Sequence, residues 1–278
     1  MKRICAAFPN RFSSSTARRG QKMNTMISIL LTILNNPLTD NTAREITRQI
    51  LISYNDLANL KAGDLAERSF CNTSTINRYC KNLGFKSFNE LKTHMVTHHD
   101  VRTAQLLHHM KVADENKMLD NITALAGVKF SRETFVRECE KLNQMIYEAP
   151  RVIITGAVFP EAMTFHYEED MLELGKCIYN TPVLKSLELP AEDENTLVIL
   201  ISFTGRMVAY CRNEYNELCR KFKRSVIMTG HNELTSVSEN HIVFRLPIVG
   251  DDEASNTVFI EIMRYLKYKY YITYCQNG

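Results

Sequence analysis

Five short runs rich in β-branched residues place the strongest constraint on what this chain can fold into. They begin at Arg151, and stretches with helical spacing, 161–174 and 207–221, separate some of them. Strands that alternate with helices are typical of a parallel sheet covered by helices. The sequence therefore predicts an α/β domain here. The expected strands are RVIITG, KCIYN, TLVILIS, RSVIMTG and HIVFRLP, and a closing helix is expected at about 255–274.

The residues before Arg151 have a different pattern, with apolar residues at helical spacing. Helices are expected at 26–34, at 39–52 with Thr39 or Asp40 as the N-cap, across 57–84 with a break at 70–72, and at 88–96. Residues 99–149 also look helical, and we interpret them as a linker followed by the first helix of the next domain. The predicted fold class is α + α/β, an all-α domain followed by a parallel-sheet α/β sandwich.

The positive charge of the chain is local. Residues 1–22 carry six basic residues and no acidic one, whereas the rest of the chain holds 28 basic and 31 acidic residues. Residues 68–92 hold five basic residues and one acidic residue. Such a patch attracts a polyanion. We interpret 1–22 as a basic disordered tail; a transit peptide, or a natural start at Met23, stays open.

The composition argues against a membrane protein and for a reducing compartment. The longest apolar run, Ile27 to Leu34, is interrupted by two hydroxyl residues and falls far short of the ~20 residues that span a bilayer. The eight cysteines contain no CxxC pair, which is typical of a reducing compartment. We therefore expect a cytoplasmic protein without a membrane partner.

The stretch CNTSTINRYCKNLGF, residues 71–85, predicts a three-turn helix with two different faces. Asn72 is suited to the N-cap, and Gly84 to the position after the C-cap. The polar face consists of Ser74, Asn77, Arg78 and Lys81, and the apolar face of Ile76, Tyr79, Cys80 and Leu83.

A second short amphipathic segment, KAGDLAERS, precedes this helix after a tight break. Two short helices joined by a brief turn form a helix-turn-helix unit, whose second helix reads the DNA major groove. The alternative is an ordinary solvated helix face. The candidate DNA-binding residues are Thr73, Ser74, Thr75, Asn77, Arg78, Lys81 and Lys86.

The stretch LAERSFCNTSTINRYCKNLGFKSFNELK, residues 65–92, resembles the N-terminal domain of RpiR-type transcriptional regulators. The matching pieces are Leu65-Ala66, Thr75, Arg78, Leu83-Gly84-Phe85, Phe88 and Leu91-Lys92. That family couples a helix-turn-helix domain to a sugar isomerase (SIS) domain, an α/β sandwich that binds phosphosugars. The resemblance implies a helix-turn-helix domain at 23–99, a linker at 100–124, and an SIS-like effector-binding and dimerisation domain at 125–278.

The chain departs from this family at the turn. Phe70 stands where the family usually has glycine, and a positive φ at this position would be costly for phenylalanine. Either phenylalanine adopts this costly conformation, or the turn is built differently from that of the family. Asn72 replaces the usual serine and caps a helix equally well.

Two expected strand ends carry the candidate effector site, because ligands of parallel sheets bind at the carboxyl ends of strands. VILISFTGRM resembles the SIS loop I-S-x-S-G-x-T, although Met207 replaces the usual threonine. ITGAVFPEA resembles the other SIS loop, G-x-G-x-S, only at Gly156. The expected effector-binding residues are Gly156, Ser202, Thr204, Gly205 and Arg206. A different small ligand, or a pocket that only supports dimerisation, stays open.

The predicted function is a DNA-binding transcriptional regulator that senses a phosphorylated sugar or related ligand as a homodimer or homotetramer. No catalysis, cofactor or metal is expected. The base candidates Glu161, His166, Glu168 and Glu169 are interpreted as a solvated helix face, and His94 and His98 as a helix surface. The alternatives are a sugar-phosphate isomerase and a ligand-free SIS interaction protein.

Overall fold

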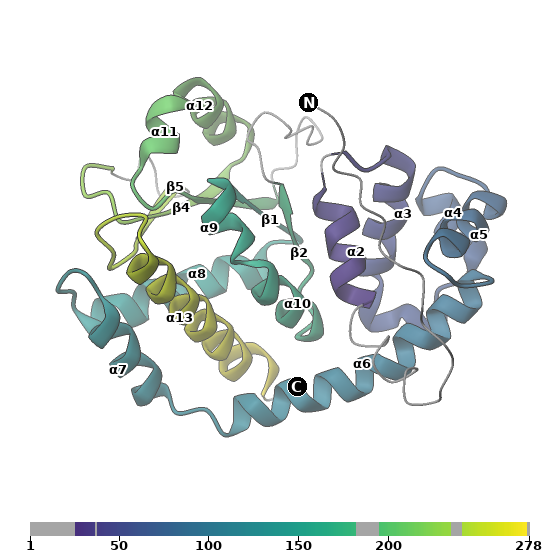
Figure 1. Cartoon of the computed structure of the whole chain (residues 1–278), viewed down its shortest axis with the longest axis horizontal. Helices are drawn as coiled ribbons and strands as arrows, with labels where there is room; N and C mark the ends of the chain where they lie inside the picture. The colour runs from purple at the N-terminus through teal and green to yellow at the C-terminus, as the bar shows by residue number, and fades with distance from the viewer. Residues whose placement is uncertain (1–25, 37, 182–194, 235–240, 277–278) are drawn as a thin grey trace, which may run out of the picture.

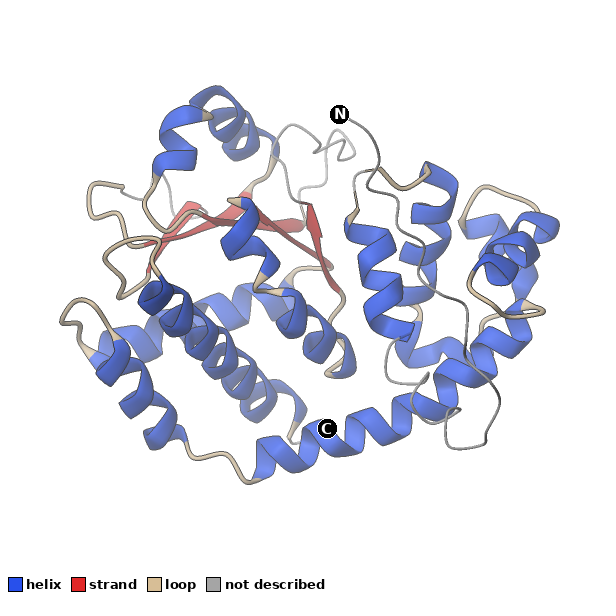
Figure 2. Ribbon diagram, in the orientation of Figure 1, coloured by secondary structure: helices blue, strands red, loops and turns tan. Residues whose placement is uncertain are grey.

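The computed structural model describes residues 26–36, 38–181, 195–234 and 241–276. The expected basic tail, residues 1–22, lies outside these residues. A group of helices precedes a five-stranded parallel sheet covered by further helices (Figure 1, Figure 2). The α + α/β fold class predicted from the sequence is therefore confirmed.

The N-terminal helices enclose their own apolar core, and we call them the head. The Asp40 side chain caps the second helix by accepting a hydrogen bond from the Ala43 N–H, as its sequence predicts. Leu30, Ile50 and Ile76 are fully buried in this core. The elements are α2 (Met26–Asn35), α3 (Asn41–Ile52), the 3₁₀ turn η1 (Tyr54–Asn59), α4 (Ala62–Arg68), α5 (Thr73–Asn82) and the first half of α6 (Phe88–Lys111).

Helix α6 is much longer than the 88–96 helix expected from the sequence. It starts at the Ser87 cap and continues to Lys111, because no glycine or proline interrupts it. The expected linker, 100–124, consists of the end of α6 and most of α7 (Glu115–Leu125). Met95 belongs to the head core, whereas Leu106 belongs to the core of the α/β domain. One continuous helix therefore joins the two cores.

All five expected strands are present in the α/β domain. The expected helices at 161–174 and 207–221 are each divided into two shorter helices. The elements are α8 (Arg132–Glu148), β1 (Arg151–Gly156), α9 (Val158–Ala162), α10 (Phe165–Glu173), β2 (Ile178–Thr181), β3 (Thr196–Ile201), α11 (Arg206–Tyr210), α12 (Arg212–Lys221), β4 (Arg224–Thr229), β5 (His241–Arg245), α13 (Glu253–Tyr270) and the π-helical turn η3 (Tyr271–Cys275).

The strand order is β2-β1-β3-β4-β5, and every neighbouring pair is parallel. The chain moves from β1 to one edge for β2 and then crosses to the other side for β3. This reversal creates a switch point between the carboxyl ends of β1 and β3, where open α/β sheets bind ligands.

Both sheet faces are covered. Leu197, Ile199 and Ile201 pack into a large core with α7, α8, α10 and α13, while Val198 and Leu200 face the α12 side. This alternation follows the two-residue period of a strand. The head packs beside β2 and α10, where Tyr179 and Leu172 join the head core (Figure 1). In the described part of the chain, no helix is long and apolar enough to cross a bilayer.

Candidate functional site

The turn between α4 and α5 is closed by two backbone hydrogen bonds. The Phe70 N–H donates to the Glu67 carbonyl at 3.0 Å, and the Cys71 N–H donates to the Ala66 carbonyl at 2.9 Å. This pair of bonds is a Schellman motif, which places one residue in the left-handed region. That residue is Phe70, with φ of 52°, and no other described non-glycine residue has a positive φ. The turn is thus intact, with phenylalanine in a conformation that favours glycine.

Helix α5 starts at the predicted Asn72 cap. The Asn72 Oδ1 atom accepts hydrogen bonds from the Thr75 N–H at 2.9 Å and the Thr75 hydroxyl at 3.0 Å. The Ser74 hydroxyl donates to the same oxygen. Both hydroxyls therefore stabilise the start of the helix before they meet any partner molecule.

The two faces of α5 are arranged as the sequence predicts. Ile76, Tyr79 and Cys80 are buried against the head. The buried Tyr79 hydroxyl lies 2.7 Å from that of Thr47, which ties α5 to α3. Burial raises the pKa of Tyr79 well above its ordinary value. The opposite face is exposed and consists of Thr73, Ser74, Asn77, Arg78 and Lys81, with Thr75 partly buried beside them.

Not all of the local positive charge belongs to this exposed face. The Lys92 ammonium donates to the Ala58 and Leu60 carbonyls at 3.0 and 3.1 Å, so it closes the end of η1. Arg68 donates to the Ser53 hydroxyl at 3.3 Å. Lys86 is exposed in the loop after α5. We call the exposed residues of α5 together with Thr75 and Lys86 the recognition face.

The second candidate site lies at the switch point. Gly156 ends β1 and is paired in register with Ile201, the last residue of β3. A Cβ atom on Gly156 would overlap the Ile201 carbonyl oxygen, so only glycine fits between these strands. Ser202 follows β3, is buried, and donates its N–H to the Met228 carbonyl at 3.0 Å.

The loop after β3 is held in a fixed conformation. Gly205 has φ of 70°, and its N–H donates to the Ser202 carbonyl at 3.1 Å. A Cβ atom on Gly205 would overlap the imidazole ring of His231, which follows β4. His231 is not among the residues expected from the sequence, because only the parallel pairing of β3 and β4 brings it to this loop.

Arg206 has a partner that the sequence did not predict. Its guanidinium forms an ion pair with Asp251, and its Nε donates to the Thr204 hydroxyl at 3.0 Å. Both charged side chains are more than half exposed, so water screens the pair. An incoming anion would compete with Asp251 for Arg206. The five expected effector residues thus lie at the carboxyl ends of β1 and β3, with His231 beside Gly205 and Asp251 beside Arg206.

The structure contradicts the interpretation of Glu161, in α9, and Glu168, in α10, as part of a solvated helix face, because both are buried. Of the other two residues in that interpretation, His166 is exposed as expected and Glu169 is half-buried. Glu161, Glu168, Asp170 and Glu173 are exposed by only 4%, 0%, 1% and 5%. The reason is tertiary: α10 lies between the head and α13, so partners from distant segments cover its acidic side (Figure 1). Buried carboxylates require such partners.

The head contacts these carboxylates directly. Asn35 of α2 donates its side-chain amide to Glu168 at 2.8 Å and accepts the Asn180 N–H at 3.1 Å. Tyr54 donates its hydroxyl to Glu173 at 3.0 Å. Ser28 also donates to a carboxylate of α10, that of Glu169. The acidic side of α10 is therefore the docking surface of the head.

Three of these carboxyl groups, Glu161, Glu168 and Glu173, have raised pKa values, and burial is the largest cause in each. Burial, with a smaller effect of the Glu168 charge, raises the pKa of Glu161 to about 8. Burial also raises the pKa of Glu168, although hydrogen bonds from Thr164, Asn35 and Asn180 oppose the shift. Glu161 thus resists ionisation near neutral pH, close to the β1 end of the switch point.

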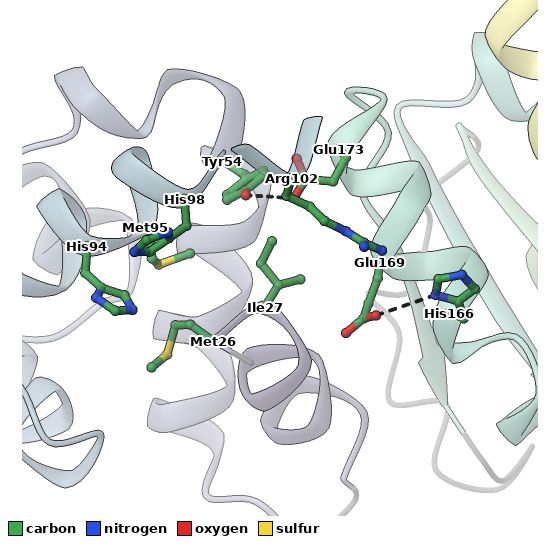
Figure 3. A pocket seen from close by; sticks show the side chains of 10 residues that line it. All are labelled: Met26, Ile27, Tyr54, His94, Met95, His98, Arg102, His166, Glu169 and Glu173. Atoms are coloured by element: carbon green, nitrogen blue, oxygen red, sulfur yellow. Dashed lines mark hydrogen bonds and ion pairs between the residues drawn. The ribbon is translucent and has the colours of Figure 1, made fainter. Parts of the chain in front are cut away.

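A cavity of about 240 Å³ lies at the junction between the head and α10 (Figure 3). Side chains from both domains point toward it, among them Met26 and His98 from the head, and His166 and Glu169 from α10. We call it the junction cavity. His94 and His98, which we expected on a helix surface, both line it.

Comparison with models of protein families gives no match, and comparison with curated proteins gives none. Among solved structures, the chain is similar to the Vibrio vulnificus NanR protein complexed with ManNAc-6P, with 17% identity, a TM-score of 0.41, and coverage of 88% of this chain and 92% of that chain. It is also similar to the protein MJ1247 from Methanococcus jannaschii, for which a 3-hexulose-6-phosphate isomerase function was inferred. That match has 13% identity, a TM-score of 0.40, and coverage of 58% of this chain and 90% of that one. At this level of likeness, neither structure identifies the function of this chain.

Proposed function

We propose that this chain is a DNA-binding transcriptional regulator of the RpiR type. The observation that carries the proposal is the α4–turn–α5 unit, whose second helix presents an exposed polar and basic face. In this proposal, α5 enters the major groove, Arg78 contacts a guanine or a phosphate, and Lys81 and Lys86 contact phosphates.

A homodimer or homotetramer would present two such heads to DNA. One short recognition helix contacts few base pairs, and helix-turn-helix dimers bind half-sites about 34 Å apart. The α/β domain is the proposed dimerisation unit, and the proposed location is the cytoplasm.

The proposed effector is a phosphorylated sugar or a related anion bound at the switch point. The residues proposed to hold it are Gly156, Ser202, Thr204, Gly205 and Arg206. Their position at the carboxyl ends of β1 and β3 supports this assignment. An effector changes the position of the head only if it binds two conformations of the protein with different affinity. Gly156 is followed directly by α9, which carries Glu161 toward α10 and the head, so the site has a short covalent route to the junction.

The first experiment is capture of sheared genomic DNA by the purified chain at ~150 mM salt, where non-specific phosphate binding is weakened. We expect a few enriched sites that share an inverted repeat. Arg78→Ala should weaken binding to such a site by about 1–3 kcal/mol, or roughly tenfold to a hundredfold. Arg212→Ala, which changes an exposed arginine of α12, is the matched control and should bind normally. Equal binding by both variants would refute the role of the recognition face.

A sugar-phosphate isomerase is the second candidate, because one observation favours it. Aldose–ketose isomerisation needs a base near the sugar, and Glu161 has a pKa of about 8 beside the β1 loop. Incubation of the chain with hexose and pentose phosphates, followed by analysis of the products, tests this alternative. Turnover that Glu161→Gln abolishes would support an enzyme. A phosphosugar panel that neither reacts nor raises the melting temperature would instead favour a ligand-free interaction protein.

A further inference from the structure

A second, larger cavity lies between α6, α7, α10 and α13. Its volume is about 530 Å³, within the range of cavities that bind small organic molecules. None of the residues proposed for the effector site lines it. It shares only Arg102 and His166 with the junction cavity. It is therefore a separate place in the fold, and we call it the α10–α13 cavity.

One end of this cavity carries an excess of positive charge. Asp170 is 1% exposed and forms ion pairs with Arg102, at 2.8 Å, and with Lys267. His166 lies 3.3 Å from the same carboxylate. Arg102 also interacts with the charge of Glu173, whereas Lys267 is only 7% exposed and Asp170 is its one ion-pair partner among the described residues. Buried charges require compensation, so a further anion is favourable here.

The other acidic residues of α10 do not line this cavity. Glu169 and Glu173 line the junction cavity instead, where Ser28 and Tyr54 donate hydrogen bonds to them. The cavity lining adds further basic groups, because His109 and Arg264 also belong to it. Arg264 lies 3.6 Å from Glu261 and is 53% exposed, so this ion pair is weak.

The remainder of the lining is largely apolar and adaptable. Ile260 lines the cavity and is 50% exposed, so part of its side chain is open to contact with an occupant. Methionine side chains fit ligands of irregular shape because they are flexible and polarizable. Four of them line the cavity: Met110, Met118, Met163 and Met263.

One buried polar group in the lining lacks a partner. The Tyr167 side chain is 4% exposed, and its hydroxyl has no hydrogen-bond partner among the described residues. Buried hydroxyl groups normally have one. A ligand oxygen beside Lys267 would add negative charge there, and one that reached Tyr167 would give its hydroxyl an acceptor.

We propose that the α10–α13 cavity binds an amphipathic organic anion, a carboxylate or phosphate group attached to an aliphatic body. The acidic group lies against Lys267 and Arg102, and the aliphatic body lies against the methionines and Ile260. Helix α6 contributes Arg102 and Leu106 to this cavity and Met95 to the head core. An occupant of the cavity therefore contacts a helix that belongs to both domains.

The test uses the full-length chain and isothermal titration with octanoate, decanoate, decyl phosphate, decanol and inorganic phosphate. Decanoate or decyl phosphate should bind at least tenfold more tightly than decanol, and inorganic phosphate should bind weakly or not at all. Two extra methylene groups should make decanoate bind about tenfold more tightly than octanoate. A preference between the two charged decyl compounds identifies the acidic group.

Lys267→Met removes the charge, keeps the side-chain length, and leaves Asp170 paired with Arg102. This variant should lose at least tenfold in decanoate affinity and should keep its affinity for decanol. Lys269→Met is the matched control on the same helix, because Lys269 pairs with Glu115 and Glu140 and does not line the cavity. Should Lys267→Met fail to fold, Ile260→Glu, at a half-exposed position, supplies the second variant and should also weaken decanoate binding.

Absence of decanoate and decyl phosphate binding to the wild type would overturn the proposal. Equal affinity for decanoate and decanol, or an equal loss in the Lys267 and Lys269 variants, would also overturn it. If Ile260→Glu instead dissociates an oligomer in sedimentation velocity and no anion binds, the cavity is an interface between copies of this chain. That outcome also refutes a ligand site.

Discussion

Replacing Phe70 by glycine should make the protein more stable, although it removes a phenylalanine. Phe70 has φ of 52° and a side chain that is 92% exposed, so its ring contributes almost no burial. A left-handed residue with a Cβ atom costs about 1–2 kcal/mol. Against this, glycine has more conformational freedom than phenylalanine in the unfolded chain, which lowers the free energy of unfolding by about 0.4–1 kcal/mol. We therefore expect Phe70→Gly to raise the free energy of unfolding by about 0.5–1 kcal/mol.

The assay is thermal unfolding followed by circular dichroism. For a chain of this size, the gain corresponds to a rise in melting temperature of about 1–4 °C. Phe70→Ala is the first control, since it removes the ring but keeps the Cβ atom, and its melting temperature should stay near that of the wild type.

The second control uses the other end of α5, which closes with the same pair of hydrogen bonds. There Gly84 has φ of 88°, and a Cβ atom would meet no neighbour within 4 Å. Gly84→Ala should therefore report backbone strain alone and lower the stability by about 1 kcal/mol. If Gly84→Ala destabilises the protein but Phe70→Gly does not stabilise it, the strain argument for the turn is wrong.

Three further predictions concern the junction and the switch point. Asn35→Ala removes the hydrogen bond to Glu168, leaves a buried carboxyl oxygen without that donor, and should lower the free energy of unfolding by about 1–3 kcal/mol in urea titrations. The pKa of Glu161 is about 8 in the folded protein and 4.5 in the unfolded chain, so the folded state binds this proton more tightly. The stability that the protonated side chain contributes is therefore complete below pH 4.5 and is lost as the pH rises toward 8. Glu161→Gln should therefore match the wild-type melting temperature near pH 4.5 and exceed it at pH 8; parallel curves would contradict the assignment. Gly205→Ala should displace the ring of His231 and weaken phosphosugar binding in titration calorimetry, and an unchanged affinity would place the effector elsewhere.

The acidic side of α10 bears on how the two domains communicate. Carboxylates of this helix hold the head through Asn35 and Tyr54, and Asp170 borders the α10–α13 cavity. Any ligand that changes the position or charge of α10 therefore changes the surface on which the head packs. Docking through buried hydrogen bonds favours a small number of discrete arrangements rather than continuous movement.

The local features of this chain could be predicted from its sequence because they depend on near neighbours. The strand cores are apolar and β-branched, so all five strands were predicted. Asp40 and Asn72 are capping residues whose acceptors lie within three residues of their donors. The faces of α5 follow from helical periodicity alone.

The features that the sequence did not reveal depend on residues far apart in the chain. Asp251 neutralises Arg206 from 45 positions away, and Asn35 meets Glu168 from 133 positions away. A run of acidic residues on one helix has the same pattern whether water or a second domain covers it. Only the packing of the head and α13 around α10 decided that these carboxylates are covered and hydrogen-bonded, and that the pKa values of Glu168 and Glu173 are raised. Burial is a property of the assembled fold and not of any local segment.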